Sequence, residues 1–119
     1  MHRVLILGAG KIGSLISGLL ASSGAYQVQL ADVDGSIAEA VVRAHGAPGL
    51  SAHALNAKQR GSLEQHLANH PVDAVISSLP FYCNVTVAEA ARTAGVHYFD
   101  LTEDVEVTRS VRAIATGSQ

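Results

Sequence analysis

The sequence predicts an α/β fold built on a doubly wound parallel sheet. Two observations lead to this prediction. Apolar runs typical of buried parallel strands alternate with segments of helical periodicity along the chain. A glycine-rich turn over residues 8–13, Gly-Ala-Gly-Lys-Ile-Gly, directly follows the first apolar run. Together they predict the strand order 3-2-1-4-5 in one domain, 1–119, that ends before a sixth strand.

Each expected element rests on its own local pattern. A continuous apolar run indicates a strand buried on both faces, and apolar residues at i, i+3, i+4 and i+7 indicate a helix. The expected strands are residues 4–7, 28–32, 50–55, 72–76 and 96–100, and the expected helices are residues 12–20, 36–44, 62–69, 87–94 and 107–114.

The periodicity also predicts which helical side chains face the sheet. In the first helix they are Ile12, Leu15, Ile16, Leu19 and Leu20, and in the second Ile37, Ala40, Val41 and Ala44. Ser36 and Glu39 have the S-x-x-E spacing of a capping box, which predicts that the second helix starts at Ser36.

The glycine-rich turn has the G-x-G-x-x-G spacing of a dinucleotide-binding Rossmann domain. Gly8 is expected to adopt a tight turn, and Gly10 to let a pyrophosphate approach the backbone. Gly13 is expected to let the helix lie close to the strand. Lys11 and Ile12 complete the turn, where the positive end of the helix dipole faces the phosphates.

An acidic residue in the expected place strengthens this prediction. Asp32 ends the second strand 19 positions after Gly13, close to the ~20 residues typical of a carboxylate that holds the adenosine ribose. Val33 follows it where an arginine often receives the 2′-phosphate of NADP, and Asp34 adds a second negative charge. The sequence therefore predicts NAD as the preferred cofactor.

Ligands of such sheets bind at the carboxyl ends of the strands. Asn56 and Ala57 follow the third strand, and residues 78–80, Ser-Leu-Pro, follow the fourth. Asn56 either reaches the adenine edge or only closes its own turn, and both alternatives stay open. We expect Ser78, Leu79 and Pro80 to border the cofactor together with the glycine turn.

Composition narrows the classes of function. The chain has 119 residues, 48% of them hydrophobic, and a net charge of −2. It has no basic surplus for nucleic acid or an anionic membrane, so we expect neither partner. A single cysteine argues against a disulfide framework and favours a reducing compartment. The first residues do not have the pattern of a signal peptide, so a cytoplasmic location is expected.

The second half resembles a known family. Residues 73–81, Asp-Ala-Val-Ile-Ser-Ser-Leu-Pro-Phe, and residues 94–100, Ala-Gly-Val-His-Tyr-Phe-Asp, are similar to segments in the N-terminal domain of the saccharopine dehydrogenase family. The family pattern often has asparagine where this chain has Ser77-Ser78, and two prolines where it has one. Members of this family include saccharopine reductases and carboxynorspermidine dehydrogenases, and the departures leave the subgroup undetermined.

The resemblance implies an oxidoreductase of amino-acid metabolism that acts on a CH–NH bond with a nicotinamide cofactor. It also implies a second domain that binds a small amino-acid-like substrate and that these 119 residues lack. We therefore expect the chain to bind a dinucleotide but to catalyse nothing alone. Whether the parent enzyme is a homodimer is left open, and no catalytic residue is assigned.

A second function remains open: a regulatory NAD-sensing module like those of potassium-transport regulators, which open with the same glycine turn and acid. The segment from Ser77 to Asp104 favours the enzyme. The sequence that follows Gln119 in the native gene would discriminate between the two.

The remaining reactive residues are expected to be structural. Cys83 is interpreted as a packing residue. Asp100 and Thr102 either border the nicotinamide or begin a helix, and the helix start is favoured. His66 and His70 have the i, i+4 spacing of a helical metal pair, but the sequence shows no third acidic or thiol ligand beside them. We therefore expect a solvated helix face and no metal site.

Overall fold

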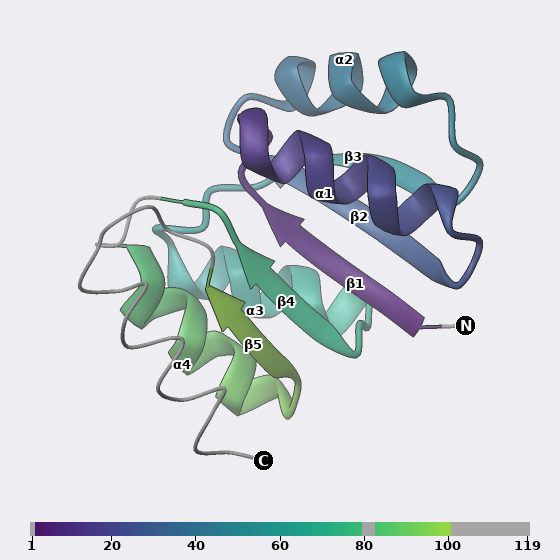
Figure 1. Cartoon of the computed structure of the whole chain (residues 1–119). Coiled ribbons are helices and arrows are strands. Elements are labelled where there is room, and N and C mark those ends of the chain that lie inside the picture. Colours follow the sequence, from purple (N-terminus) through teal and green to yellow (C-terminus); the bar gives the residue numbers. More distant parts are fainter. Residues whose placement is uncertain (1, 80–82, 101–119) are drawn as a thin grey trace.

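The structure is a computed structural model that describes residues 2–79 and 83–100 (Figure 1). The strands are β1 (His2–Leu7), β2 (Tyr26–Asp32), β3 (Leu50–Ala54), β4 (Ala74–Ser77) and β5 (His97–Asp100). The helices are α1 (Lys11–Ser22), α2 (Gly35–His45), α3 (Arg60–Asn69) and α4 (Asn84–Ala94). The helix expected over 107–114 lies outside the described residues, as do Pro80 and Thr102.

The five strands form one parallel sheet in the order β3-β2-β1-β4-β5, which confirms the predicted topology. The central strand β1 pairs with β2 on one side and with β4 on the other. Figure 1 shows α1 and α2 on one face of this sheet and α3 and α4 on the other. The order of the strands reverses beside β1, which places a crevice at the carboxyl ends of β1, β2 and β4.

The core consists of two apolar layers, one on each face of the sheet. Leu5 and Leu7 of β1 pack toward α3 and α4, whereas Val4 and Ile6 pack toward α1 and α2. All four are at most 4% exposed. The apolar run at residues 4–7 is therefore buried on both faces, as a central parallel strand requires.

Helix α1 packs on the sheet through small side chains, and the predicted face is partly wrong. Leu15 and Leu19 are 60% and 64% exposed, while Ile16 and Leu20 pack at the edge of the core. The residues that α1 buries are Gly13, Ser17, Gly18 and Ala21. Small residues bring the helix axis close to the sheet, and the larger leucines are then turned outward.

The start of α2 also differs from the prediction. The residue that caps it is Asp34, whose carboxylate accepts hydrogen bonds from the backbone N–H of Ser36 at 3.0 Å and from its hydroxyl at 2.6 Å. The capping box of Ser36 and Glu39 is thus wrong, because an aspartate two residues upstream takes the capping position. The buried face moves with it: Ala38 is buried and Ile37 is 46% exposed.

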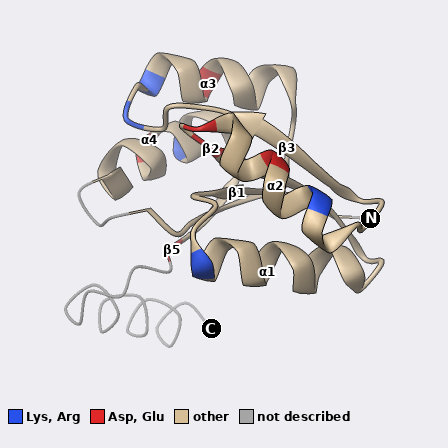
Figure 2. Cartoon of the chain, turned by 90° about the horizontal axis from the view of Figure 1, so that it is seen from above, with Lys and Arg blue, Asp and Glu red and all other residues tan. Residues whose placement is uncertain are grey.

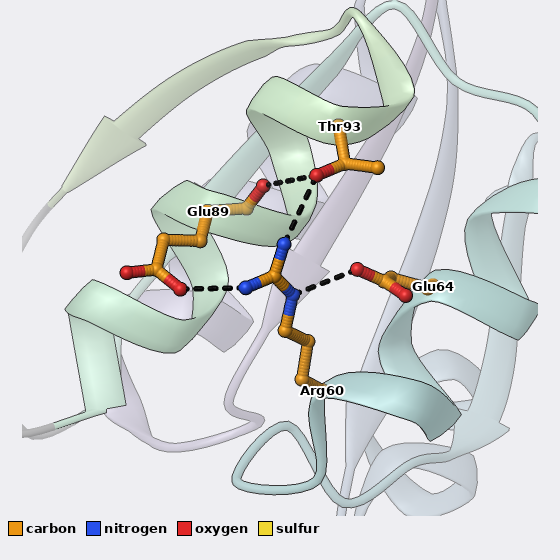
Figure 3. A network of polar contacts seen from close by, with 4 residues as sticks. All are labelled: Arg60, Glu64, Glu89 and Thr93. Carbon is orange, nitrogen blue, oxygen red and sulfur yellow. Dashed lines mark hydrogen bonds and ion pairs between the residues drawn. The ribbon is translucent and has the colours of Figure 1, made fainter.

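Arg60 connects the two helices on the other face (Figure 3). Its Nε donates to Glu64 Oε1 within α3 at 2.7 Å, and its Nη1 donates to Glu89 Oε2 of α4 at 2.7 Å. Its Nη2 donates to the hydroxyl of Thr93 at 3.1 Å, and that hydroxyl donates in turn to the Glu89 carbonyl. The planar guanidinium thus fixes the position of α4 relative to the first turn of α3.

Charged residues are spread over the described part of the chain without gathering by sign (Figure 2). Blue and red segments stand apart from one another over the described chain, in keeping with the small net charge. Among the described residues, no helix combines the length and the apolar character needed to cross a membrane.

Candidate dinucleotide site

The glycine turn begins with a backbone conformation that favours glycine. Gly8 has φ +97°, in the region that L side chains rarely adopt. Its N–H donates to the Ala31 carbonyl of β2 at 2.8 Å. A Cβ at this position would lie 2.8 Å from the Ser78 hydroxyl. Gly8 thus turns the chain sharply away from β1 while it stays bonded to the neighbouring strand.

Gly10 leaves open space at the start of α1. It is the N-cap residue, with φ −72° and an extended ψ, and no side chain caps the helix there. A Cβ on Gly10 would meet no atom of the described chain within 4 Å. The leading N–H groups of α1 therefore face an unobstructed region, together with the positive end of the helix dipole. Lys11 is exposed beside it, and Ile12 is partly buried.

Gly13 is required by the packing of α1 against β1. A Cβ on it would lie 1.9 Å from the Gly8 carbonyl oxygen, which is far inside a van der Waals contact. The buried hydroxyl of Ser17 donates to the Gly13 carbonyl at 2.5 Å. The three glycines thus have the three geometries that the sequence predicts for them: a turn, an open approach and a close packing contact.

Asp32 lies at the end of β2 and bonds directly to the glycine turn. Its Oδ2 accepts from the N–H of Ala9 at 2.9 Å, and its Oδ1 accepts from the N–H of Asp34 at 3.0 Å. Each carboxylate oxygen has a further lone pair for another donor. Val33 next to it is 71% exposed. Hydrogen bonds from Ser36 hold the pKa of Asp34 below its usual range, so this second carboxylate is charged at neutral pH.

A cavity of about 270 Å³ opens beside Asp32 at the carboxyl ends of the strands. It brings together half of the residues that the sequence assigns to the cofactor. Those residues are Gly8, Asp32, Val33, Asn56, Ala57 and Leu79. The other described candidates, Gly10, Lys11, Ile12, Gly13 and Ser78, do not line it. The cavity is also lined by Leu7, Ala31, Leu55, Lys58 and Cys83, which the sequence analysis did not assign to the site.

Two of these additional residues carry some signal in the sequence. Lys58 directly follows the predicted pair Asn56-Ala57, so an extension of that loop by one position would have included it. Cys83 precedes α4 as its N-cap and is 4% exposed. This burial fits the packing role expected for Cys83, which also lines the cavity.

Asn56 closes a turn and lines the cavity. Its Oδ1 accepts from the N–H of Lys58 at 3.0 Å, which is an Asx-turn. Ala57 beside it is 7% exposed and leaves room in the cavity. The geometry therefore accounts for Asn56 as a turn residue, while its place in the cavity wall leaves contact with a ligand open.

Ser78 supports the glycine turn through hydrogen bonds to its backbone. Its hydroxyl lies 3.0 Å from the carbonyl oxygens of both Leu7 and Gly8, to which it donates. Ser78 therefore positions the turn rather than lining the cavity, which Leu79 does instead.

A second polar cluster lies where β4 and β5 end. The buried Ser77 hydroxyl donates to Asn84 Oδ1 at 3.0 Å, and Asn84 Nδ2 donates to Asp100 Oδ2. The Tyr98 hydroxyl donates to the same carboxylate oxygen at 3.2 Å. Burial, followed by the Asp100 charge and hydrogen bond, raises the pKa of Tyr98 well above its usual range. The contacts of Asn84 were not predicted from the sequence, because its partners come from two different strands.

One expectation about the histidines is wrong. His66 is not part of a solvated helix face: it is partly buried, and its ring stacks on that of His70 with 4.6 Å between the ring centroids. Its ring also meets that of His53, which comes from the edge strand β3, with 5.0 Å between the ring centroids.

Comparison with known proteins identifies the family and supports the fold. Residues 4–116 match the family model described as "Saccharopine dehydrogenase NADP binding domain". Among solved structures, saccharopine dehydrogenase (L-Glu forming) from Saccharomyces cerevisiae superposes with a TM-score of 0.74 at 24% identity. That match covers 84% of this chain and 21% of the yeast enzyme, so the chain spans about a fifth of its length.

Two further solved structures, both in complex with NAD, have the same fold. The Bordetella bronchiseptica enzyme WbmG in complex with NAD gives a TM-score of 0.67 at 22% identity, over 83% of this chain and 36% of its own. UDP-glucose 4-epimerase from Bifidobacterium longum in complex with NAD⁺ and UDP gives 0.63 at 18% identity, over 79% and 34%.

Proposed function

Because this chain belongs to the family of saccharopine dehydrogenase NADP-binding domains, we propose that it is the cofactor-binding part of an oxidoreductase acting on the CH–NH bond of an amino-acid-like substrate. Family membership makes it a dinucleotide-binding domain of the oxidoreductase type. The amino-acid-like substrate class goes beyond what family membership shows and is part of our proposal. It is supported by residues 73–81 and 94–100, which resemble the corresponding segments of the saccharopine dehydrogenase family.

The observation that supports cofactor binding most directly is the open space over Gly10. A dinucleotide needs a place where its pyrophosphate meets backbone N–H groups without a side chain between them. Gly10 provides this space at the N-terminus of α1, and Asp32 is held beside it by the Ala9 N–H. When bound, the nicotinamide would accept the hydride from the carbon that bears the amine.

We propose that NAD is preferred over NADP. The free lone pairs of Asp32 would accept hydrogen bonds from the ribose hydroxyls, and charge-assisted bonds of this kind contribute roughly 1.5–3 kcal/mol each. A 2′-phosphate would instead meet the carboxylates of Asp32 and Asp34. The exposed Val33 offers no positive charge to offset that repulsion.

Calorimetric titration of NAD and NADP into the protein tests both parts of the proposal. We expect NAD to bind more tightly, and the double substitution Asp32→Ser with Val33→Arg to reverse the order. Val33→Arg alone serves as the matched control, because it adds the charge but keeps the carboxylate. Equal or tighter binding of NADP by the unmodified chain would refute the preference, and binding of neither would refute the cofactor site.

The proposal extends to the parent enzyme. Residues outside these 119 would hold the substrate carbon against the nicotinamide, and such positioning contributes several kcal/mol to lowering the barrier. We therefore expect the chain alone to bind NAD without turnover of saccharopine, carboxynorspermidine or related amino acids. An NADH absorbance change under steady-state conditions would show that the catalytic residues lie within this chain. The single free cysteine, Cys83, is buried and fits the reducing cytoplasm that we propose as the location.

A further inference from the structure

Three histidines from two elements meet at the edge of the sheet, away from the glycine turn. His53 comes from the edge strand β3, His66 from the last turn of α3, and His70 is the residue that ends α3. One ring nitrogen of each lies within 4.8 Å of one ring nitrogen of each of the others. The ring centroids are 5.0 Å apart for His53 and His66, and 5.1 Å apart for His53 and His70.

Neighbouring polar groups orient two of these rings. His66 Nε2 lies 2.8 Å from Gln29 Oε1, and His53 Nε2 lies 3.0 Å from the Ser51 hydroxyl. Gln29 also donates to the His70 carbonyl at 3.4 Å. A histidine that donates from one ring nitrogen carries its lone pair on the other. Metal-bound histidines almost always have such a partner on the nitrogen that does not bind the metal.

The cluster is compact enough for a metal ion to close it. Three nitrogens around a tetrahedral zinc ion, at bonds of about 2.0–2.1 Å, lie about 3.4 Å from one another. The present separations, at most 4.8 Å, exceed this distance by about 1.4 Å or less. His70 is exposed at the end of α3 and its ring stacks on that of His66, whereas the other two histidines are partly buried.

We propose that His53, His66 and His70 form a binding site for a divalent transition metal ion, with Zn²⁺ as its occupant. Three imidazole ligands suit zinc, and a water molecule would complete the tetrahedron. The ion would tie the edge strand β3 to the end of α3.

Zinc titration of the untagged protein, first stripped with EDTA, tests the site without any activity assay. We expect one ion per chain, and an affinity at least about 10-fold lower in each of His53→Gln, His66→Gln and His70→Gln. We expect at least about 10-fold because mutating an outer-shell partner alone typically lowers metal affinity roughly 10- to 100-fold, and these histidines would bind the ion directly. His97→Gln is the matched control, since it removes an exposed histidine of β5 and should leave the affinity unchanged. Gln29→Ala should weaken binding by about 10-fold through the orientation of His66.

His53→Gln is the decisive variant. If it binds zinc as tightly as the unmodified chain, the ion is held by the i, i+4 pair of α3 alone and the three-histidine site is wrong. Absence of zinc binding by the unmodified chain would likewise overturn it and leave three rings that only pack. Because a variant could fail to fold, the ring resonances of the unmodified protein are followed by NMR during the titration. Zinc should shift His53, His66 and His70 together, and a titration in which His53 does not shift would refute the proposal.

Discussion

Replacement of Gly10 by alanine separates cofactor binding from folding more cleanly than any other change in the glycine turn. The residue has φ −72°, which alanine adopts without strain, and its Cβ would meet no described atom within 4 Å. Alanine restricts the unfolded chain, which stabilises the fold by about 0.4–1 kcal/mol, but it is a poorer N-cap than glycine. These effects oppose each other, so we expect the free energy of unfolding to change by less than about 1 kcal/mol.

The effect on the ligand should be much larger. The new methyl group would occupy the space through which a pyrophosphate reaches the first N–H groups of α1. Loss of two charge-assisted hydrogen bonds at roughly 1.5–3 kcal/mol each amounts to at least about 3 kcal/mol. Since 1.4 kcal/mol is tenfold in affinity, NAD should bind about 100-fold more weakly or worse.

Calorimetry with NAD and thermal unfolding followed by circular dichroism measure the two quantities on the same preparation. Gly61→Ala is the matched control: its Cβ also meets open space, but it lies in α3 on the other face of the sheet. It should leave the affinity unchanged and raise stability by up to about 1 kcal/mol. If Gly10→Ala binds NAD within a few-fold of the unmodified chain and is equally stable, the pyrophosphate does not pass over Gly10, and the reasoning fails.

Four further outcomes are expected. Gly13→Ala should lower the free energy of unfolding by about 1–3 kcal/mol or more, because its Cβ would lie 1.9 Å from the Gly8 carbonyl oxygen; an unchanged melting temperature would contradict this contact. Ser78→Ala should cost about 1 kcal/mol and also weaken NAD binding, since its hydroxyl supports the turn at the Leu7 and Gly8 carbonyls; full affinity would limit its role to folding. Arg60→Lys should lower the melting temperature slightly, and 1 M salt should reduce the difference if the contact with Glu89 is the cause. In EDTA, stability should fall as the pH drops from about 6.5 toward 4, because the unfolded chain protonates His66 before the folded chain does, with His53 and His70 facing it; His66→Gln should flatten this slope.

Features that depend on neighbouring residues in the sequence were predicted well. The order of strands follows from the alternation of strand and helix together with the position of the glycine turn, and the structure confirms it. The third strand, expected within 50–55, is found at Leu50–Ala54. The conformations of Gly8, Gly10 and Gly13 follow from their spacing alone, because each spacing corresponds to one place along a strand, a turn and a helix.

Features that depend on how closely elements approach were not predicted. Helix α1 has a regular row of leucines, and periodicity alone turns that row toward the sheet. The contact between Gly13 and the Gly8 carbonyl brings the helix too close for it, so Leu15 is turned outward. At α2, two side chains are each able to cap the helix, and local spacing cannot tell that Asp34 takes the capping position expected for Ser36.

The histidine cluster also depends on how two elements approach each other, and it could not be predicted from the spacing along one helix. A search for metal ligands along one helix finds His66 and His70 and stops for lack of a third ligand. The third, His53, lies 13 positions before His66 on the edge strand β3, and its ring meets those of His66 and His70 only in the folded chain. His53 and Ser51 point to the same face of β3, since residues two apart in a strand share a face. Gln29 pairs with Ser51 across the sheet and faces the same helix. Strand register combined with the position of α3 therefore brings His53 and Gln29 to the side of the sheet where His66 and His70 lie, which helix periodicity alone does not show.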